Sequence, residues 1–579
     1  MTTTRWVPAL VFSAIASGTA LWLQNVLRDT WQIRTLPERV EEWLLLFVPL
    51  DLFEQGLQRL GADAKEVALF GTVVGMTALL VALGTFALRV NWTSWRLLGL
   101  GVGMWLVAMA GVMPVTGAGF FATGLLTAPV LVNAAYLVVF LGYAVVLIGG
   151  RLLSHLGVRD RPTMMAERRA LLAGAVGTLL AGGIARLVGS QGGLVASSLP
   201  LAAAPTAESA STPRPAPTAQ TAQTPPPIAA QATAVPKPTP AVQATPTLEP
   251  LPNPPPPQHI ARDKDGALTA AGRPKGELAT PITANDDFYV VTKNAVMDPI
   301  VDAAAWRLVI DGEVNRPVQV DYRTLLALPA VEVTKTLECI SNFTAGCGLT
   351  SFGCDLISTA RWKGARLSDV LNLAGGLKST AVGLAFLSTD EFSAGLPPEV
   401  VDDPETLLVY EMNGEPLPRV HGFPARLLVP GRYGMKNPKW LAGIRAMTQE
   451  YQGWYEQRNW NKDGIIKTMA RIDVPADGAR LTAGPQRVAG IAYAGARGVQ
   501  AVELSTDDGG TWRPAAILEP MPGKDAMIRW ETALMLPAAT TVTLTVRATD
   551  GNGDVQTEEF QLPQPDGASG RDSITISAA

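Results

Sequence analysis

Residues 336–342 are TLECISN, and Cys339 at the centre of this stretch is one of only three cysteines in a chain of 579 residues. A thiolate is a soft ligand that suits redox metals, and a bound metal keeps the thiol deprotonated. A free cysteine, however, usually behaves as a small apolar residue of a core. On Cys339 alone, an ordinary buried thiol is the expected interpretation, so its neighbours along the chain decide the matter.

Several blocks flank this stretch. They are WRLVIDGEVN at 306–315, RWKG at 361–364, HGFPAR at 421–426, KW at 439–440 and WYEQR at 454–458. In this order and at these distances, the blocks resemble the molybdopterin domain of the sulfite oxidase family, and the resemblance extends over about residues 280–565. It implies an enzyme with an α+β sulfite-oxidase-like molybdopterin domain over 266–468. It also implies a molybdenum-molybdopterin cofactor and oxygen-atom transfer to or from a small molecule.

The same resemblance implies roles for individual residues. Cys339 is implied to be the catalytic residue and the metal ligand. The residues implied to hold the cofactor are Asp286, Tyr289, Val290, Asp390, His421, Arg426, Asn437, Pro438 and Lys439. A pterin phosphate is an anion, which suits the bidentate fork of arginine and the point charge of lysine. Taken singly, an arginine is more often part of a solvated surface, and His421 more often an ordinary loop histidine.

Three positions depart from the family's sulfite-binding pattern. Val291 and Thr344 stand where the family has arginines, and Trp460 stands near where it has a tyrosine. Each lost charge-assisted hydrogen bond is worth about 1.5–3 kcal/mol. We therefore expect a sulfoxide or N-oxide as substrate rather than sulfite. Sulfite oxidation through other arginines stays open as an alternative (Arg361, Arg432 and Arg458), as does a non-catalytic scaffold that keeps the fold.

An insertion, FTAGCGLTSFGC, occupies residues 343–354 and holds Cys347 and Cys354. In an oxidising compartment, two cysteines at this spacing can close a small loop, and a disulfide is the favoured interpretation. Two unpaired thiols are one alternative. The other is that one of the two sulfurs also approaches the metal.

The first 190 residues predict an all-α transmembrane bundle. Five apolar stretches approach the ~20 residues that span a bilayer: 7–24, 66–88, 97–115, 128–150 and 170–189. Buried helices of a soluble domain are the less favoured interpretation, because long uncharged apolar stretches are rare there. The first stretch is expected to be retained rather than cleaved as a signal peptide, because no small-residue cleavage site follows it.

The loops between these stretches predict an orientation. The 151–169 loop carries five arginines and the 89–96 loop carries Arg89 and Arg96, whereas the 116–127 loop carries no charge. Basic loops stay in the cytoplasm. The prediction is a multi-pass cell-membrane protein with a cytoplasmic N-terminus and an extracytoplasmic catalytic domain. The 25–65 loop, with five basic residues interleaved with acids, disagrees mildly; within it, 43–60 predicts an interfacial helix.

The apolar stretches hold few residues for redox chemistry. The chain has three histidines, none inside a predicted span, and no CxxCH motif for c-type haem. We therefore interpret this unit as an anchor or a dock. Electrons must then be exchanged with a separate carrier, such as a cytochrome or a quinone-linked protein. A net charge of −4 without a basic stripe excludes nucleic acid as a partner.

The remaining segments predict a linker and a final module. Residues 191–265 consist mostly of Pro, Ala, Thr, Gln and Ser, so a disordered, semi-stiff linker is expected. Apolar and polar residues alternate over 541–548, and DDGG at 507–510 is typical of a hairpin turn. We expect an all-β Ig-like sandwich over 469–565 and a flexible tail over 566–579. The run VELSTDDGGTW at 502–512 resembles the dimerisation domain of sulfite oxidases, which implies a homodimer.

Overall fold

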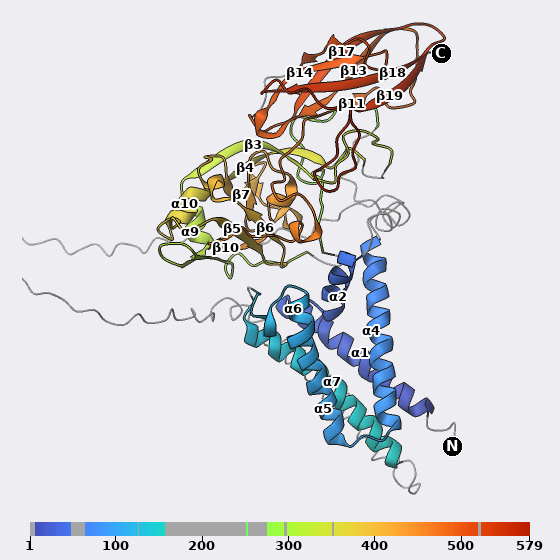
Figure 1. Cartoon of the computed structure of the whole chain (residues 1–579), viewed down its shortest axis with the longest axis vertical. Coiled ribbons are helices and arrows are strands. Elements are labelled where there is room, and N and C mark those ends of the chain that lie inside the picture. The colour runs from blue at the N-terminus through green and yellow to red at the C-terminus, as the bar shows by residue number, and fades with distance from the viewer. Residues whose placement is uncertain are drawn as a thin grey trace, which may run out of the picture.

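The computed structural model describes residues 6–47, 64–125, 127–156, 251–252, 275–294, 298–349, 353–518 and 523–578. They form a helical unit, a β-rich middle domain and a C-terminal β module, stacked in that order in Figure 1. The predicted fifth span, 170–189, lies outside the described residues. So does the predicted linker over 191–265, apart from residues 251–252.

The helical unit contains four helices that are long and apolar enough to cross a membrane: Trp6–Trp31, Val67–Arg89, Ser94–Val115 and Pro129–Leu153. They overlap the first four predicted stretches, which are confirmed as long apolar helices. The corresponding elements are α1 (Trp6–Trp31), α4 (Ala64–Arg89), α5 (Ser94–Leu106) and α7 (Pro129–Leu156). The π-helical turn η4 (Val107–Val112) and α6 (Met113–Val115) continue α5, and the short η5 (Phe120–Ala122) follows.

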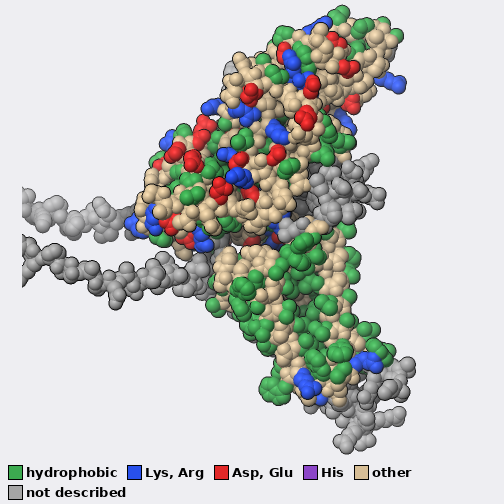
Figure 2. Space-filling view, viewed as in Figure 1, with side chains coloured by type: hydrophobic (Ala, Val, Ile, Leu, Met, Phe, Trp, Pro, Cys, Tyr) green, Lys and Arg blue, Asp and Glu red, His purple; other side chains and the backbone are tan. Residues whose placement is uncertain are grey.

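Large apolar side chains cover the outside of this unit. Phe70 is 69% exposed, Leu79 67% and Val130 81%, and Figure 2 shows hydrophobic side chains along the length of these helices. Small residues lie inside, where they let helices approach closely: a Cβ on Gly101 would stand 2.7 Å from the carbonyl oxygen of Phe140. Apolar outside and small inside is the pattern of a bundle that packs in lipid.

The connection between α1 and α4 contains a short polar helix, α2 (Leu36–Leu44), and the single turn η2 (Leu45–Phe47). Thr35 and Glu38 form a capping box at its start, where the Thr35 backbone N–H donates to Glu38 Oε2 at 2.7 Å. We expected a helix over 43–60. Instead, the cap begins the helix at Leu36, and residues 48–63 lie outside the described part of the chain.

The middle domain is built from two sheets. One has the order β2-β1-β10-β5-β6 and the other β3-β4-β7-β8, with β9 also paired to β7. The strands are β1 (Arg307–Gly312), β2 (Val318–Asp321), β3 (Ala330–Glu338), β4 (Ile357–Arg366), β5 (Gly383–Ser388), β6 (Ser393–Leu396), β7 (Leu407–Met412), β8 (Glu415–Pro416), β9 (Arg426–Leu428) and β10 (Leu441–Met447). Among the described strands of this domain, β1 and β10 pair in parallel and the other pairs are antiparallel. The helices α9 (Tyr322–Leu326) and α10 (Leu367–Asn372) are short, so the expected α+β domain is chiefly β.

The core of this domain holds the strand that leads to Cys339. Trp362 on β4 is fully buried, and its Nε1 donates to the carbonyl oxygen of Lys335 on β3 at 3.1 Å. The two strands stay in register up to the Glu338–Ile357 pair. Cys339 is therefore the first residue beyond a strand whose position is fixed by a packed core.

The C-terminal module consists of two facing sheets, with the orders β11-β13-β17-β16 and β12-β19-β18-β14-β15. Trp530, Leu544 and Val546 are fully buried between them. The strands are β11 (Met469–Val474), β12 (Arg480–Leu481), β13 (Gly484–Tyr493), β14 (Val499–Ser505), β15 (Arg513–Pro514), β16 (Ala516–Ile517), β17 (Ile528–Leu536), β18 (Thr541–Asp550) and β19 (Ser573–Ala578). The alternation read from 541–548 is the alternation of β18, whereas the Ig-like label stays a prediction.

The flexible tail expected over 566–579 is wrong for its last part. Residues Ser573–Ala578 form β19, which pairs with β18 on one side and β12 on the other. Ile574 and Ile576 are buried by this pairing. The sequence SITIS alternates in the manner of a strand, and that signal was missed because the segment lies at the end of the chain.

Buried polar contacts join the two β-rich domains. Lys335 on β3 and Asp525, just before β17, are 2.8 Å apart and each 2% exposed. Tyr493 Oη donates to Asp525 Oδ1 at 2.8 Å. Since a buried charge is costly without its partner, this ion pair favours one fixed placement of the C-terminal module.

The insertion closes a disulfide between Cys347 and Cys354, whose Cα atoms are 5.1 Å apart. This confirms the favoured interpretation of the two cysteines in the structure. Arg471 on β11 donates to the carbonyl oxygen of Cys354 and pairs with Asp355 at 3.0 Å. The closed loop therefore lies against the C-terminal module.

Thiol counting tests this disulfide in the purified protein. Under denaturing conditions without reductant, we expect one reactive thiol per chain, that of Cys339. After reduction all three cysteines should react. Labelling of three thiols before reduction would show that Cys347 and Cys354 are free.

Candidate functional site

A cavity opens beside Cys339, at the edge where β3, the 285–294 segment and the 419–440 segment meet. Its lining contains nine of the ten predicted site residues: Tyr289, Val290, Cys339, Asp390, His421, Arg426, Asn437, Pro438 and Lys439. They come from parts of the chain up to 150 residues apart, so the fold brings the separate sequence blocks to one place. Their roles at a cofactor remain to be argued from the contacts.

Asp286 is the predicted residue that the structure does not bring to the cavity. It lies in the turn before Phe288, and its side chain is exposed. Phe288 and Tyr289 turn inward instead, at 2% and 7% exposure, and both line the cavity. The inward-facing part of the DDFYV block therefore begins two residues later than we expected.

Cys339 is held by backbone hydrogen bonds on both sides. Its N–H donates to the Leu356 carbonyl at 2.9 Å, and its carbonyl accepts from the Asn342 N–H at 2.9 Å. The side chain amide of Asn342 completes the turn, because its Oδ1 accepts from the Leu356 N–H at 3.0 Å. Cys339 is the cysteine outside the disulfide, and it is 8% exposed. Because the disulfide uses both other sulfurs, Cys339 is the cysteine available as a metal ligand.

Gly422, between His421 and Arg426 in the sequence, lets His421, Arg426 and Lys439 come close together. Gly422 has φ +113°, and a Cβ there would stand 3.1 Å from the Cβ atoms of both Arg426 and Lys439. The His421 Nε2 lies 3.1 Å from the carbonyl oxygen of Asn285. Burial, with Lys439 and Arg426 nearby, lowers the pKa of His421 to about 3. The imidazole is therefore neutral at pH 7, and it donates to Asn285 from Nε2.

Arg426 is a buried cation. Its Nη1 donates to the His421 carbonyl at 3.2 Å and its Nη2 to the Asn437 carbonyl at 2.9 Å. Burial lowers the pKa of Arg426 to about 10. Within the described part of the chain, its Nε is buried without a hydrogen-bond partner, and no carboxylate pairs with the guanidinium. A buried arginine that faces a cavity in this state fits an anionic ligand such as the phosphate of molybdopterin.

The side chains of Lys439 and Asn437 make their hydrogen bonds mainly to the backbone. Lys439 Nζ donates to the Val291 carbonyl at 3.2 Å and the Val420 carbonyl at 2.8 Å. The side chain of Asn437 binds backbone groups. Its Oδ1 accepts from the Val429 N–H, and its Nδ2 donates to the carbonyl oxygens of Tyr433 and Arg432. Asn437 therefore shapes the wall of the cavity, while Arg426 and Lys439 supply its charge.

Asp390 shares its carboxylate among several donors. Its Oδ1 accepts from the Phe392 N–H at 3.1 Å and its Oδ2 from Asn294 Nδ2 at 3.1 Å. Lys293 Nζ lies 4.0 Å from Oδ2. This arrangement holds the carboxylate in the cavity wall, where it can still accept hydrogen bonds from a ring edge.

Several lining residues were not predicted. Phe392 and Tyr455 pack edge to face, with ring centroids 5.8 Å apart, and Tyr455 also packs on Trp460 at 6.0 Å. Lys293 also lines the cavity. It comes two positions after Val291, which stands where the family has an arginine. The TKN sequence at 292–294 was the available signal. The arginines considered as replacements, Arg361, Arg432 and Arg458, are not among the lining residues.

Comparisons with known proteins match the two β-rich domains. Residues 295–455 match the family described as oxidoreductase molybdopterin binding domain, and residues 462–562 match the Mo-co oxidoreductase dimerisation domain. The chain is 31% identical over 303 residues to mitochondrial sulfite oxidase of Homo sapiens, covering 45% of this chain and 54% of that protein. It is 29% identical over 345 residues to sulfite oxidase of Gallus gallus, covering 52% of this chain and 74% of that protein.

Two further matches are a nitrate reductase and a solved structure. NADH nitrate reductase of Ulva prolifera is 30% identical over 286 residues, which is 41% of this chain and 32% of that protein. Among solved structures, the sulfane dehydrogenase SoxCD from Paracoccus pantotrophus matches with a TM-score of 0.43 at 26% identity, over 48% of this chain and 75% of that one. The chain spans about half the length of the mammalian sulfite oxidases that it matches.

The sequence matches and the donor set lead to the same conclusion. A cysteine outside the disulfide at the end of a core strand, and a buried arginine that no carboxylate of the described residues pairs with, are suited to a molybdenum pterin. Residues 295–455 therefore match a molybdopterin-binding oxidoreductase domain and residues 462–562 a Mo-co dimerisation domain, and the two together are similar to sulfite oxidases.

Proposed function

We propose that this chain is a membrane-anchored enzyme that works outside the cytoplasm and moves an oxygen atom to or from a small, uncharged substrate. A sulfoxide or an N-oxide is favoured over sulfite. Electrons pass to or from a separate carrier, and the C-terminal module forms a homodimer, in keeping with its match to a Mo-co dimerisation domain.

The observation that carries the substrate class is the lining near Cys339. Ile340, Phe392, Met435 and Tyr455 are apolar or aromatic. The cations of the cavity already have partners: Arg426 donates to the His421 carbonyl, Lys439 donates to the Val420 carbonyl, and Lys293 pairs with an acid. An apolar wall favours an uncharged substrate, because an oxyanion there would lose its hydration without gaining donors.

Individual residues have distinct tasks in this proposal. Cys339 holds the metal, and Arg426 and Lys439 hold the anionic end of the cofactor. When bound, the molybdenum centre supplies oxygen-atom transfer coupled to a change of two electrons. Burial raises the pKa of Tyr455 above its usual range, so its hydroxyl stays protonated and can donate a hydrogen bond to a substrate oxygen.

Sulfite oxidation is the second candidate, and one observation favours it. Lys293 supplies a cation to the cavity that the sequence pattern did not lead us to expect. A substrate screen on molybdenum-loaded protein separates the two candidates. We expect a reduced dye to be oxidised by a sulfoxide or an N-oxide. Faster reduction of an artificial acceptor by sulfite would replace the proposed substrate class with sulfite.

The orientation in the membrane is a further part of the proposal. The soluble domains lie at one end of the helical unit, and the N-terminus and the end of α7 lie at the other (Figure 1). Lys and Arg side chains gather at that far end in Figure 2. Basic groups remain cytoplasmic, so this arrangement supports a catalytic domain on the outside.

Protease accessibility tests this orientation. Protease added to intact cells or spheroplasts should cut between residues 195 and 260 and release a molybdenum-containing fragment of about 300 residues, because exposed linkers are preferred cleavage sites. A peptide tag inserted in the 151–169 loop, which is expected to be cytoplasmic, should remain uncut under the same treatment. Release of the fragment only after the membrane is broken would place the catalytic domain in the cytoplasm.

A further inference from the structure

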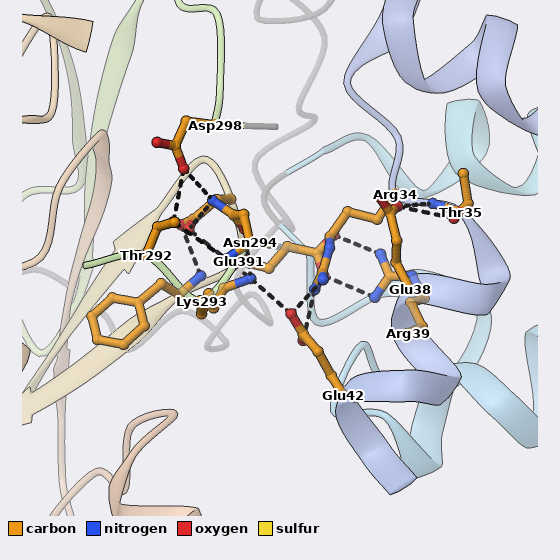
Figure 3. Close-up of polar contacts among 12 residues, drawn as sticks. Arg34, Thr35, Glu38, Arg39, Glu42, Thr292, Lys293, Asn294, Asp298 and Glu391 are labelled. Atoms are coloured by element: carbon orange, nitrogen blue, oxygen red, sulfur yellow. Dashed lines mark hydrogen bonds and ion pairs between the residues drawn. The ribbon is translucent and has the colours of Figure 1, made fainter. Parts of the chain in front are cut away.

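The helical unit touches the catalytic domain through α2, close to the cavity (Figure 3). Arg39 on α2 forms a two-pronged ion pair with Glu391, with N–O distances of 2.5 and 2.8 Å. Its side chain is 2% exposed. Glu391 directly follows Asp390, which lines the cavity. This ion pair therefore fixes α2 at the rim of the site.

Glu42, one turn further along α2, reaches the cavity wall itself. Its Oε1 lies 3.3 Å from Lys293 Nζ, and its Oε2 accepts from Arg34 Nη1 at 2.8 Å. Burial alone would raise the pKa of Glu42, but the charges of Arg34 and Lys293 hold it well below its usual range. The carboxylate is therefore ionised, and it faces a cation that lines the cavity.

A second cation lies on the other side of Glu42. Arg458 Nη2 is 3.5 Å from the Glu42 backbone carbonyl, and the guanidinium stacks on Trp454 at 3.5 Å from the ring centroid. The neighbouring Tyr455 lines the cavity. The Glu42 carboxylate therefore pairs with Arg34 of the helical unit and Lys293 of the segment after Tyr289, while Arg458 contacts the backbone of the same residue.

Glu42 supplies much of the negative charge that balances the buried ammonium group of Lys293. Its side chain is 2% exposed, so water does little to stabilise its charge. Besides Glu42, its partners are Asn294 Oδ1 at 3.2 Å and Asp390 at 4.0 Å. Asp390 already accepts from Asn294 and Phe392. Without Glu42, an anion entering the cavity would be the nearest replacement.

We propose that Glu42 is a specificity-determining residue that the helical unit contributes to the site. It neutralises Lys293 at the cavity and thereby disfavours oxyanion ligands such as sulfite or sulfate. The inference rests on the proposed function, because it explains how a cavity that contains a lysine can prefer an uncharged substrate. It assigns the anchor a part in substrate choice as well as in attachment.

Glu42→Gln tests the inference, since it removes the charge and keeps the shape. Sulfate, an oxyanion that does not react, is titrated calorimetrically into full-length, molybdenum-loaded protein at constant ionic strength. We expect sulfate to bind about tenfold more tightly than in the unaltered protein. The ratio of kcat/KM for sulfite to that for a sulfoxide should rise by a similar factor.

Two controls separate charge from loosening of the interface. Glu391→Gln removes an ion pair at the same interface without removing the charge that faces Lys293, and it should leave sulfate affinity unchanged. Adding Lys293→Met to Glu42→Gln should abolish the gain in sulfate affinity. Should Glu42→Gln fail to fold, Glu42→Asp keeps the charge and moves it away from Lys293. Sulfate affinity is then expected to increase about threefold.

Unchanged sulfate affinity in Glu42→Gln with normal molybdenum content would overturn the inference. An equal gain in Glu391→Gln would also overturn it, because loosening of the interface would then be the cause. The proposed function fails separately, by the reaction of the unaltered protein with sulfite, whereas this inference concerns only the change in anion binding that follows the loss of Glu42.

Discussion

Cys339→Ala should abolish turnover while the protein stays folded and keeps much of its pterin. We expect activity to fall by at least about a thousandfold, equivalent to about 4 kcal/mol in activation free energy. In the proposed site, the Cys339 thiolate would be the protein's ligand to the metal, whereas Arg426 and Lys439 would hold the opposite end of the cofactor. Cys339 is small and 8% exposed, so its loss removes little from the core.

Steady-state rates, molybdenum content and circular dichroism together check this expectation. The double variant Cys347→Ser and Cys354→Ser is the matched control, because it removes the other two sulfurs and leaves Cys339 in place. It should retain most of the molybdenum and the activity. Turnover by Cys339→Ala at a rate close to that of the unaltered protein would mean that the metal is bound elsewhere.

Arg426→Met should lower molybdenum and pterin content sharply. Each charge-assisted hydrogen bond to the cofactor phosphate is worth about 1.5–3 kcal/mol, so loss of the guanidinium should weaken binding by about tenfold to a hundredfold or more. Molybdenum is measured by mass spectrometry and the released pterin by fluorescence. Arg445→Met is the matched control, since Arg445 lies on β10 of the same domain, in an exposed pair with Asp311.

The stability of the cofactor-free protein separates a binding role of Arg426 from a structural one. Arg426 is buried, and within the described residues no carboxylate pairs with it. Its replacement by an apolar side chain of similar length should leave the Tm of cofactor-free protein unchanged or higher. Full molybdenum occupancy in Arg426→Met, together with a lower Tm, would show that Arg426 only supports the fold.

Much of the candidate site was predictable because its residues occur in compact blocks. Cys339 follows a strand whose partner carries Trp362, and the HGFPAR block places His421 and Arg426 around a left-handed glycine. Such local patterns survive in a single sequence. Asp286 lies outside the cavity lining because adjacent residues of a turn point in different directions, and the block itself does not show which of them turns inward.

The contacts between distant segments were not predictable in the same way. Glu42 and Lys293 are 251 positions apart, and no periodic pattern relates them. The 25–65 loop opposed the orientation that the other loops predicted because it is rich in basic residues. The structure shows Arg28, Arg34 and Arg39 paired with Glu38, Glu42 and Glu391. In the structure, these basic residues therefore serve contacts within the protein.

X-ray absorption at the molybdenum edge tests the central claim most directly. The spectrum of the unaltered protein is compared with that of Cys339→Ser, at equal molybdenum content. We expect the variant to lose one sulfur neighbour of the metal, because the cysteine sulfur is replaced while the sulfurs of the pterin remain. The same number of sulfur neighbours in both spectra, or no molybdenum in the unaltered protein, would contradict the assignment of Cys339 as the metal ligand in this cavity.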